Sequence, residues 1–152
     1  MDNRDRQILQ ALQADSSQSL QALAEQVGLT HNPCWRRVNR LEDAGIIRGY
    51  GARLDREKLG LEVVAFLQVK SAVQTPAWHR EFMQKLQAEQ AVTGIYRTAG
   101  KFDYLLQVMT PTMRHYDGVY RQLLMETAGV GQVVTWFVME EVKPIGEIPL
   151  AS

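Results

Sequence analysis

Along the first 47 residues, apolar positions recur every three or four residues, which predicts three short amphipathic helices. Ile8, Leu9 and Leu12 form the apolar stripe of the first helix. The second helix is expected to follow Ser19 and to stop at Gly28, and the third to run from Thr30 to Gly45. Since only residues 28–30 separate the second helix from the third, the pair matches the helix-turn-helix pattern.

Residues 46–54, IIRGYGARL, alternate between apolar and polar positions and carry two glycines, which predicts a strand or wing beside the helices. We therefore expect residues 1–53 to form a winged helix-turn-helix domain. The turn-rich stretch 54–62 is expected to act as a linker.

From residue 63 onward the pattern changes to alternating strands and helices. Strands are predicted over 63–71, 92–100, 103–110 and 133–143, and helices over 76–90 and 111–129. The order βαββαβ is the ferredoxin-like arrangement, so the fold class is α+β with a second domain over 63–144. Residues 145–152 are expected to form a loose C-terminal tail.

The predicted strands are apolar in both registers. In residues 63–71, for example, Val64 and Phe66 point to one face of the sheet, and Ala65 and Leu67 to the other. Because two helices cover only one face of a four-stranded sheet, the other apolar face is expected to pack against a second subunit. The sequence thus predicts a homodimer.

Composition narrows the class of protein. No apolar run approaches the roughly 20 residues of a membrane span, and the charged, amphipathic start is unlike a signal peptide. One cysteine cannot form an internal disulfide, and three scattered histidines do not make a zinc site with it. We therefore expect a cytoplasmic protein with no membrane partner, no metal and no cofactor.

Positive charge gathers in one place although the net charge is zero. Between residues 31 and 53 the acids are Glu42 and Asp43 alone, against a larger set of arginines. A local surplus of this kind favours contact with an anion such as DNA. The arginines are Arg36, Arg37, Arg40, Arg48 and Arg53.

At about 100° per residue, the third helix turns Cys34, Val38 and Leu41 toward the core. Its opposite face presents guanidinium and carboxamide groups, which hydrogen-bond base edges in the major groove and phosphates beside it. We therefore expect DNA contacts from Asn32, Arg36, Asn39 and Arg40, and phosphate contacts from Arg48 or Arg53.

Three other residues of the third helix each have two possible roles. Arg37 lies on a flank, where it either pairs with an acid of the first helix or touches DNA. Trp35 either packs under the wing or stacks near a sugar. Cys34 fits a small core residue better than a redox sensor, because its face is apolar.

The stretch YRTAGKFDYLL, residues 96–106, is the candidate for ligand binding in the second domain. Gly100 allows close backbone approach, Asp103 suits an ammonium group, and Arg97 suits a carboxylate. Those are the two charges of a free amino acid. The alternative is a plain hairpin turn in which Asp103 bonds its own backbone.

Catalysis is not indicated. His79 and His115 fall on different predicted helices, without a nucleophile, a phosphate loop or paired carboxylates at useful spacing. We therefore do not expect an enzyme.

Two stretches carry a family resemblance that covers essentially the whole chain. LAEQVGLTHNPCWRRVNRLEDAGIIRGYGARLD and TAGKFDYLLQV are similar to the Lrp/AsnC (feast/famine) family of regulators. The resemblance implies a winged DNA reader joined to a C-terminal (RAM) domain that dimerises, assembles into tetramers or octamers and binds a small effector, usually an amino acid. In that family the effector lies near this turn at a subunit contact, and the matching positions here are Thr98, Gly100, Asp103 and Tyr104. Thr135 and Trp136 on the last predicted strand are weaker candidates, and alternation along that strand places Trp136 either on the helix-covered face or at a subunit contact.

The expected function is that of a sequence-specific transcriptional regulator. Its expected partners are operator half-sites in double-stranded DNA and an amino-acid effector. Two alternatives remain: an architectural DNA-binding protein with little effector dependence, and a sirohaem-decarboxylase-like enzyme on the same fold.

Overall fold

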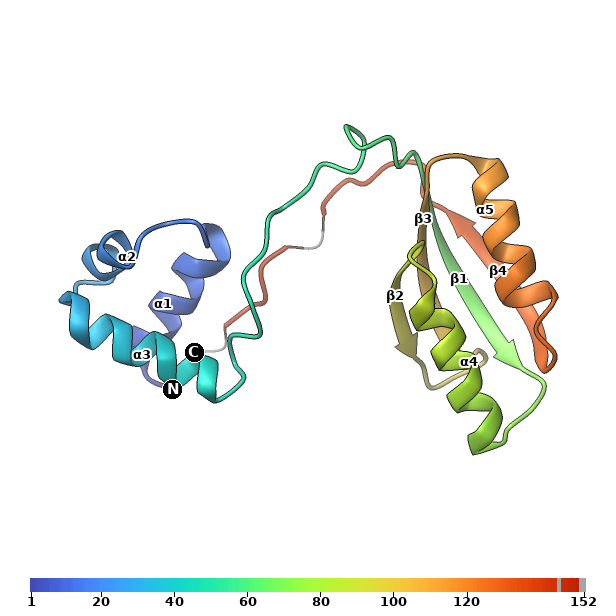
Figure 1. Cartoon of the computed structure of the whole chain (residues 1–152), viewed down its shortest axis with the longest axis horizontal. Coiled ribbons are helices and arrows are strands. Elements are labelled where there is room, and N and C mark those ends of the chain that lie inside the picture. The colour runs from blue at the N-terminus through green and yellow to red at the C-terminus, as the bar shows by residue number, and fades with distance from the viewer. Residues whose placement is uncertain (145, 151–152) are drawn as a thin grey trace. The chain divides into compact units, whose positions relative to one another are not determined.

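The computed structural model describes residues 1–144 and 146–150. The chain forms two compact units (Figure 1), one of residues 1–53 with 143–152 and the other of residues 54–142. Each unit has its own hydrophobic core.

The N-terminal unit contains α1 (Asn3–Ala14), α2 (Leu20–Gln26) and α3 (His31–Asp43). Asp2 and Asp5 form a reciprocal capping box at the start of α1, and Ser19 caps α2 through the N–H of Ala22. Thr30 occupies the N-cap position of α3, but its side chain makes no cap hydrogen bond. The helices pack around a core that includes Ile8, Leu9, Leu23, Cys34 and Leu41.

Two parts of this unit differ from the sequence-based expectation. Residues 46–54 run as an extended segment and not as a strand, because no other segment of the described chain pairs with them. The tail is not loose. The side-chain amide of Gln13 accepts a hydrogen bond from the N–H of Ile148 at 2.6 Å and donates one to its carbonyl at 3.2 Å. Leu150 packs against the core of this unit, while residues 145, 151 and 152 lie outside the described residues.

The second unit contains β1 (Val63–Ser71), α4 (Pro76–Ala88), β2 (Val92–Arg97), β3 (Tyr104–Thr110), α5 (Met113–Tyr120) and β4 (Val130–Phe137). A π-helical turn, η1 (Arg121–Met125), continues α5. The strands pair antiparallel in the order β2-β3-β1-β4. The predicted βαββαβ fold is therefore confirmed.

Element ends account for the differences in this unit. The predicted strands 92–100 and 103–110 stop at Arg97 and start at Tyr104, leaving a longer connecting loop. The predicted strand 133–143 starts at Val130 and ends at Phe137, which pairs with Ala65 near the start of β1.

The two faces of the sheet are both apolar, as the alternation predicts. Ala65, Leu67 and Val69 lie on the face that packs against α4, α5 and η1. The opposite face carries the other register, and cross-strand pairing places Phe66 beside Trp136. We call this the open face; it includes Val64, Phe66, Tyr96, Leu105, Met109, Val134 and Trp136.

Candidate nucleic-acid interface and effector site

Three buried residues fix the orientation of α3. Cys34, Val38 and Leu41 recur at helical spacing and lie in the core, with Cys34 fully buried. Burial also raises the pKa of the Cys34 thiol, which disfavours the reactive thiolate. Because these side chains face inward, the opposite face of α3 must face outward.

The N-terminal half of that outward face is free to meet a partner. Asn32 and Arg36 are exposed, and Trp35 is 50% exposed. Within the described chain no hydrogen bond or ion pair holds the Arg36 guanidinium, whereas Arg37 and Arg40 are both held. Asn39, further along the helix, is half-buried.

The held arginines contact the first turn of α1. Arg37 Nη1 lies 2.6 Å from Asp2 Oδ2 and 2.8 Å from Asp5 Oδ1. Arg40 Nη2 lies 2.7 Å from each carboxylate oxygen of Asp5. Of the two readings that the sequence left open for Arg37, the structure contains the pairing with acids of the first helix.

The segment after α3 carries the remaining basic candidates. Arg48 and Arg53 are exposed, and Arg53 Nη2 donates to the backbone carbonyl of Gln13. Tyr50 donates a 2.7 Å hydrogen bond to Glu42 at the end of α3. Burial and the Glu42 carboxylate raise the pKa of Tyr50 to about 12, so it stays a donor. This bond fastens the segment to α3.

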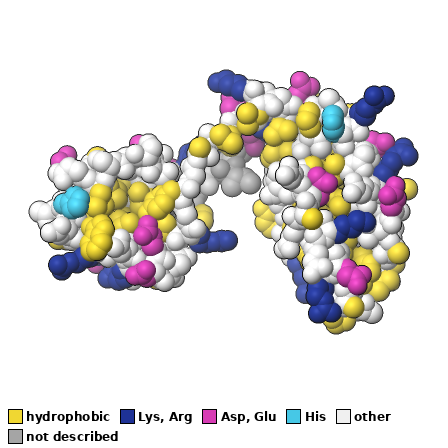
Figure 2. All heavy atoms as spheres, in the orientation of Figure 1, with side chains coloured by type: hydrophobic (Ala, Val, Ile, Leu, Met, Phe, Trp, Pro, Cys, Tyr) yellow, Lys and Arg dark blue, Asp and Glu magenta, His cyan; other side chains and the backbone are white. Residues whose placement is uncertain are grey.

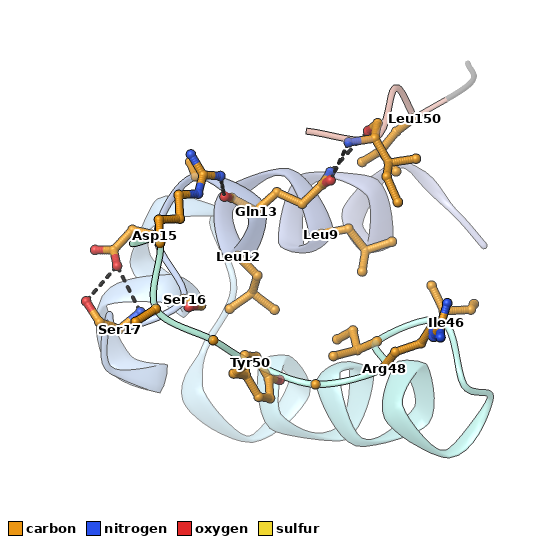
Figure 3. Close-up of a pocket in the computed structure, with 17 residues that line it drawn as sticks. Leu9, Leu12, Gln13, Asp15, Ser16, Ser17, Ile46, Arg48, Tyr50 and Leu150 are labelled. Atoms are coloured by element: carbon orange, nitrogen blue, oxygen red, sulfur yellow. Dashed lines mark hydrogen bonds between the residues drawn. The ribbon is translucent and has the colours of Figure 1, made fainter. Parts of the chain in front are cut away.

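A hollow of about 640 Å³ opens between α1, this segment and the tail (Figure 3). Leu9 and Leu12 of α1 line it on one side, and Ile46 and Tyr50 on another (Figure 3). Leu150 of the tail closes part of its rim. The space-filling view shows hydrophobic side chains gathered on the visible face of this unit, with charged ones around them (Figure 2). The sequence did not indicate this hollow, because it depends on the tail folding back onto α1.

The candidate effector turn joins β2 to β3. Gly100 has a φ of +146°, which favours glycine, and a side-chain atom added there would meet nothing within 4 Å. Arg97 is exposed, and Thr98 Oγ1 donates to the carbonyl of Phe102 at 2.8 Å. The turn is thus bonded internally, and both Arg97 and the backbone at Gly100 are accessible.

Asp103 is held by the end of β1. Its carboxylate accepts hydrogen bonds from the N–H and Oγ of Ser71 at 2.8 and 3.0 Å, and its Oδ1 lies 3.1 Å from Lys70 Nζ. Gln74 approaches at 3.4 Å. Sequence reasoning missed Lys70, Ser71 and Gln74. The βαββαβ order offered a signal, since it places the end of β1 beside the start of β3.

Tyr104 is buried on the helix-covered side rather than exposed in the turn. Its hydroxyl lies 2.5 Å from Nδ1 of His79 on α4, and its ring packs edge-on against Phe82. Thr135 also faces the helices, where it shares a 2.9 Å hydrogen bond with Tyr116. Trp136 lies on the open face and is 62% exposed. The turn therefore brings together Arg97, Thr98, Gly100 and Asp103, but not Thr135 or Trp136.

The bonding of Asp103 predicts a pH effect on stability. The Ser71 N–H, followed by Lys70 and the Ser71 hydroxyl, outweighs burial and lowers the pKa of Asp103 from 3.8 to about 2. A lowered folded-state pKa stabilises the protein above the unfolded value, and that stability is lost as pH falls toward about 2. Replacing Asp103 with asparagine should flatten the decline in unfolding free energy over this range, measured by urea unfolding at each pH.

The flattening should be partial, because the pKa of Asp2, hydrogen-bonded to Arg37, also falls to about 2. Asp103→Asn and wild-type protein with identical pH slopes would show that the Ser71 and Lys70 contacts do not persist in solution.

The described residues also limit other chemistries. Residues 1–144 and 146–150 contain no group of three or more His, Cys, Asp or Glu side chains placed to hold a metal ion. In the same residues, no helix is both long enough and apolar enough to cross a bilayer.

The chain thus joins a helix-turn-helix, whose second helix presents Asn32 and Arg36 outward, to a separate βαββαβ domain. The model of the Lrp/AsnC ligand binding domain matches residues 64–148, and that of a winged helix-turn-helix DNA-binding domain matches residues 1–48. The chain therefore belongs to the Lrp/AsnC family.

Individual relatives agree along the whole chain. The DNA-binding transcriptional activator DecR of Escherichia coli K12 is 41% identical over 99% of both chains. The crystal structure of an AsnC family transcriptional regulator from Agrobacterium tumefaciens superposes with a TM-score of 0.92 at 36% identity, covering 98% of this chain and 97% of that one. A regulator of Neisseria meningitidis solved as an L-Met complex gives 0.92 at 32% identity, covering 98% and 96%. These relatives are named as regulators, so the class of protein that the fold and the family models define is a DNA-binding transcriptional regulator with a ligand-binding domain.

Proposed function

We propose that this protein is a sequence-specific regulator that reads operator half-sites with α3 and responds to an amino acid. The single observation that carries the DNA part is the geometry of α3. Its buried face is fixed by the core, and its exposed N-terminal half presents Asn32 and the unheld Arg36. In a helix-turn-helix, that half of the second helix enters the major groove.

We propose a homodimer that packs the two open faces together. Trp136 and Tyr96 are 62% and 51% exposed there, and large exposed apolar patches mark interaction surfaces. A twofold dimer offers two α3 helices to half-sites about one helical turn apart. Further assembly into tetramers or octamers, and a cytoplasmic location beside the DNA, complete the proposal.

Selection from a randomised duplex library tests the DNA part. The purified protein should enrich a motif with twofold symmetry and bind it about 10³-fold or more tighter than a shuffled duplex at the same salt concentration. Enrichment of no motif, with binding of all duplexes alike, would favour an architectural role instead.

The effector part rests on the turn between β2 and β3. Arg97 and the backbone around Gly100 are accessible to a carboxylate, and Asp103 follows Gly100 by three residues in the same connection. The Neisseria meningitidis relative was solved with L-Met, which supports an amino acid as the class of effector without naming the one used here. Because Asp103 is also bonded to Ser71 and Lys70, it would both shape the turn and attract an ammonium group.

A thermal-shift screen of the twenty amino acids identifies the effector, since a ligand that binds the native state raises the melting temperature. We expect at least one hit in the wild-type protein and none in Asp103→Ala. Asp117→Ala, which removes an exposed acid from α5, should keep the shift. If Asp103→Ala responds like the wild type, the effector binds elsewhere.

A further inference from the structure

The first turn of α1 holds the DNA reader at several points. Asp5 is only 1% exposed, although it is a carboxylate, and two guanidinium groups of α3 contact it. Its carboxylate accepts a hydrogen bond from the N–H of Asp2, which fixes it within the capping box. Arg4, the residue before Asp5, donates a hydrogen bond to the backbone carbonyl of Val27 at the end of α2. This bond joins the start of α1 to the turn of the helix-turn-helix.

These contacts divide the arginines of α3 into two kinds. The charges of Arg37 and Arg40 are balanced by Asp2 and Asp5, even though Arg40 remains 61% exposed. Arg36 has no such partner among the described residues. A cation already paired with a carboxylate gains less from a phosphate and displaces fewer counterions from DNA than a free one.

Resting on the proposed function, we propose that Asp5 is a positioning residue for DNA recognition. It balances Arg37 and Arg40 against α1, restrains their attraction to phosphates of any sequence, and leaves base reading to Asn32 and Arg36. The sequence pattern placed Arg36 and Arg40 together on the DNA-facing side of α3 and left Arg37 open, whereas the contacts with Asp5 set Arg37 and Arg40 apart from Arg36. Its contribution would be to specificity, because it suppresses the sequence-independent part of binding.

The test uses Asp5→Asn, which keeps an acceptor for the N–H of Asp2 but removes the charge. Binding to the enriched duplex and to a shuffled duplex is measured by fluorescence anisotropy across a range of salt concentrations. Each guanidinium released to a phosphate should steepen the slope of log K against log salt by about 0.9. We therefore expect a slope steeper by about 1 to 2, tighter binding to the shuffled duplex and a lower ratio of specific to non-specific affinity.

The matched control is Asp43→Asn, which removes an exposed acid from the last turn of α3, the helix that carries Arg37 and Arg40. It makes the same change in net charge without freeing Arg37 or Arg40. An equal change in slope for both variants, or an unchanged slope in a folded Asp5→Asn protein, would overturn the proposal. A residue that only supported the fold would lower the melting temperature without steepening the slope.

Arg40→Ala keeps the proposal testable if Asp5→Asn does not fold. Because Asp5 already balances the charge of Arg40, Arg40→Ala in a protein that keeps Asp5 should leave the slope of log K against log salt unchanged. A slope shallower by about 0.9 would contradict the proposal. In a double-mutant cycle, Arg40→Ala should remove part of the steepening caused by Asp5→Asn. If no duplex binds the wild-type protein, the proposed function itself is wrong. If the wild-type protein binds its operator and Asp5→Asn has the same salt slope and affinity ratio as the wild type, only this inference is wrong.

Discussion

Replacing Trp136 with lysine should separate the proposed dimer and weaken binding to a duplex with two half-sites by about 10²-fold or more. Trp136 is 62% exposed on the open face and pairs with Phe66 of β1, and most of its neighbours on that face are apolar. A lysine there would bring two ammonium groups into the twofold contact without water to solvate them. Each helix-turn-helix domain would then bind one half-site alone. The affinity gained by linking two binding domains, typically 10²- to 10⁴-fold, would be lost.

Two measurements check this prediction. Sedimentation velocity should give the mass of a monomer for Trp136→Lys, and anisotropy should give the loss of affinity for the enriched duplex. Met139→Lys is the matched control, because Met139 is 96% exposed and lies beyond the end of β4. A Trp136→Lys protein that stays dimeric and binds normally would show that the open face is not the dimer contact.

Replacing Arg36 with alanine should cost about 10- to 100-fold in affinity for the enriched duplex, the equivalent of 1–3 kcal/mol for a base contact. The guanidinium is exposed on the outward face of α3 and is not held within the described chain, so its loss should leave the fold intact. Arg36→Lys should recover only part of the affinity, because an ammonium group cannot form the paired hydrogen bonds of a guanidinium.

The shuffled duplex separates two roles for Arg36. A base contact predicts a larger loss on the enriched duplex than on the shuffled one, whereas a phosphate contact predicts similar losses and a shallower salt slope. Arg114→Ala, which removes an exposed arginine from α5, controls for net charge. Unchanged affinity of Arg36→Ala at fixed salt would remove Arg36 from the interface.

Local patterns were enough to predict the fold and the outward face of α3. The spacing of Cys34, Val38 and Leu41 determines which side of that helix is buried, and the strand alternation made both faces of the sheet apolar. The wing strand was predicted wrongly. Alternation over 46–54 indicates an extended chain, but a strand also needs a partner, which the sequence pattern does not supply.

Side-chain contacts between residues far apart in the sequence could not be predicted from local patterns. Asp5 and Arg40 are 35 residues apart, and Gln13 and Ile148 are 135 apart, so neither contact follows from spacing. Asp103 was more accessible to prediction, since antiparallel pairing of β1 with β3 brings its carboxylate to Ser71. Reading the predicted topology for its neighbouring strand ends would have located Lys70 and Ser71 as well.

In the proposed function, a twofold dimer reads DNA by placing α3 in successive major grooves. Methylation-interference footprinting on the enriched duplex, which probes guanine N7 in the major groove, tests it most directly. We expect two clusters of interfering guanines about 10 base pairs apart, both weakened by Arg36→Ala. Interference spread evenly along the duplex, or confined to one cluster that Arg36→Ala leaves unchanged, would contradict it.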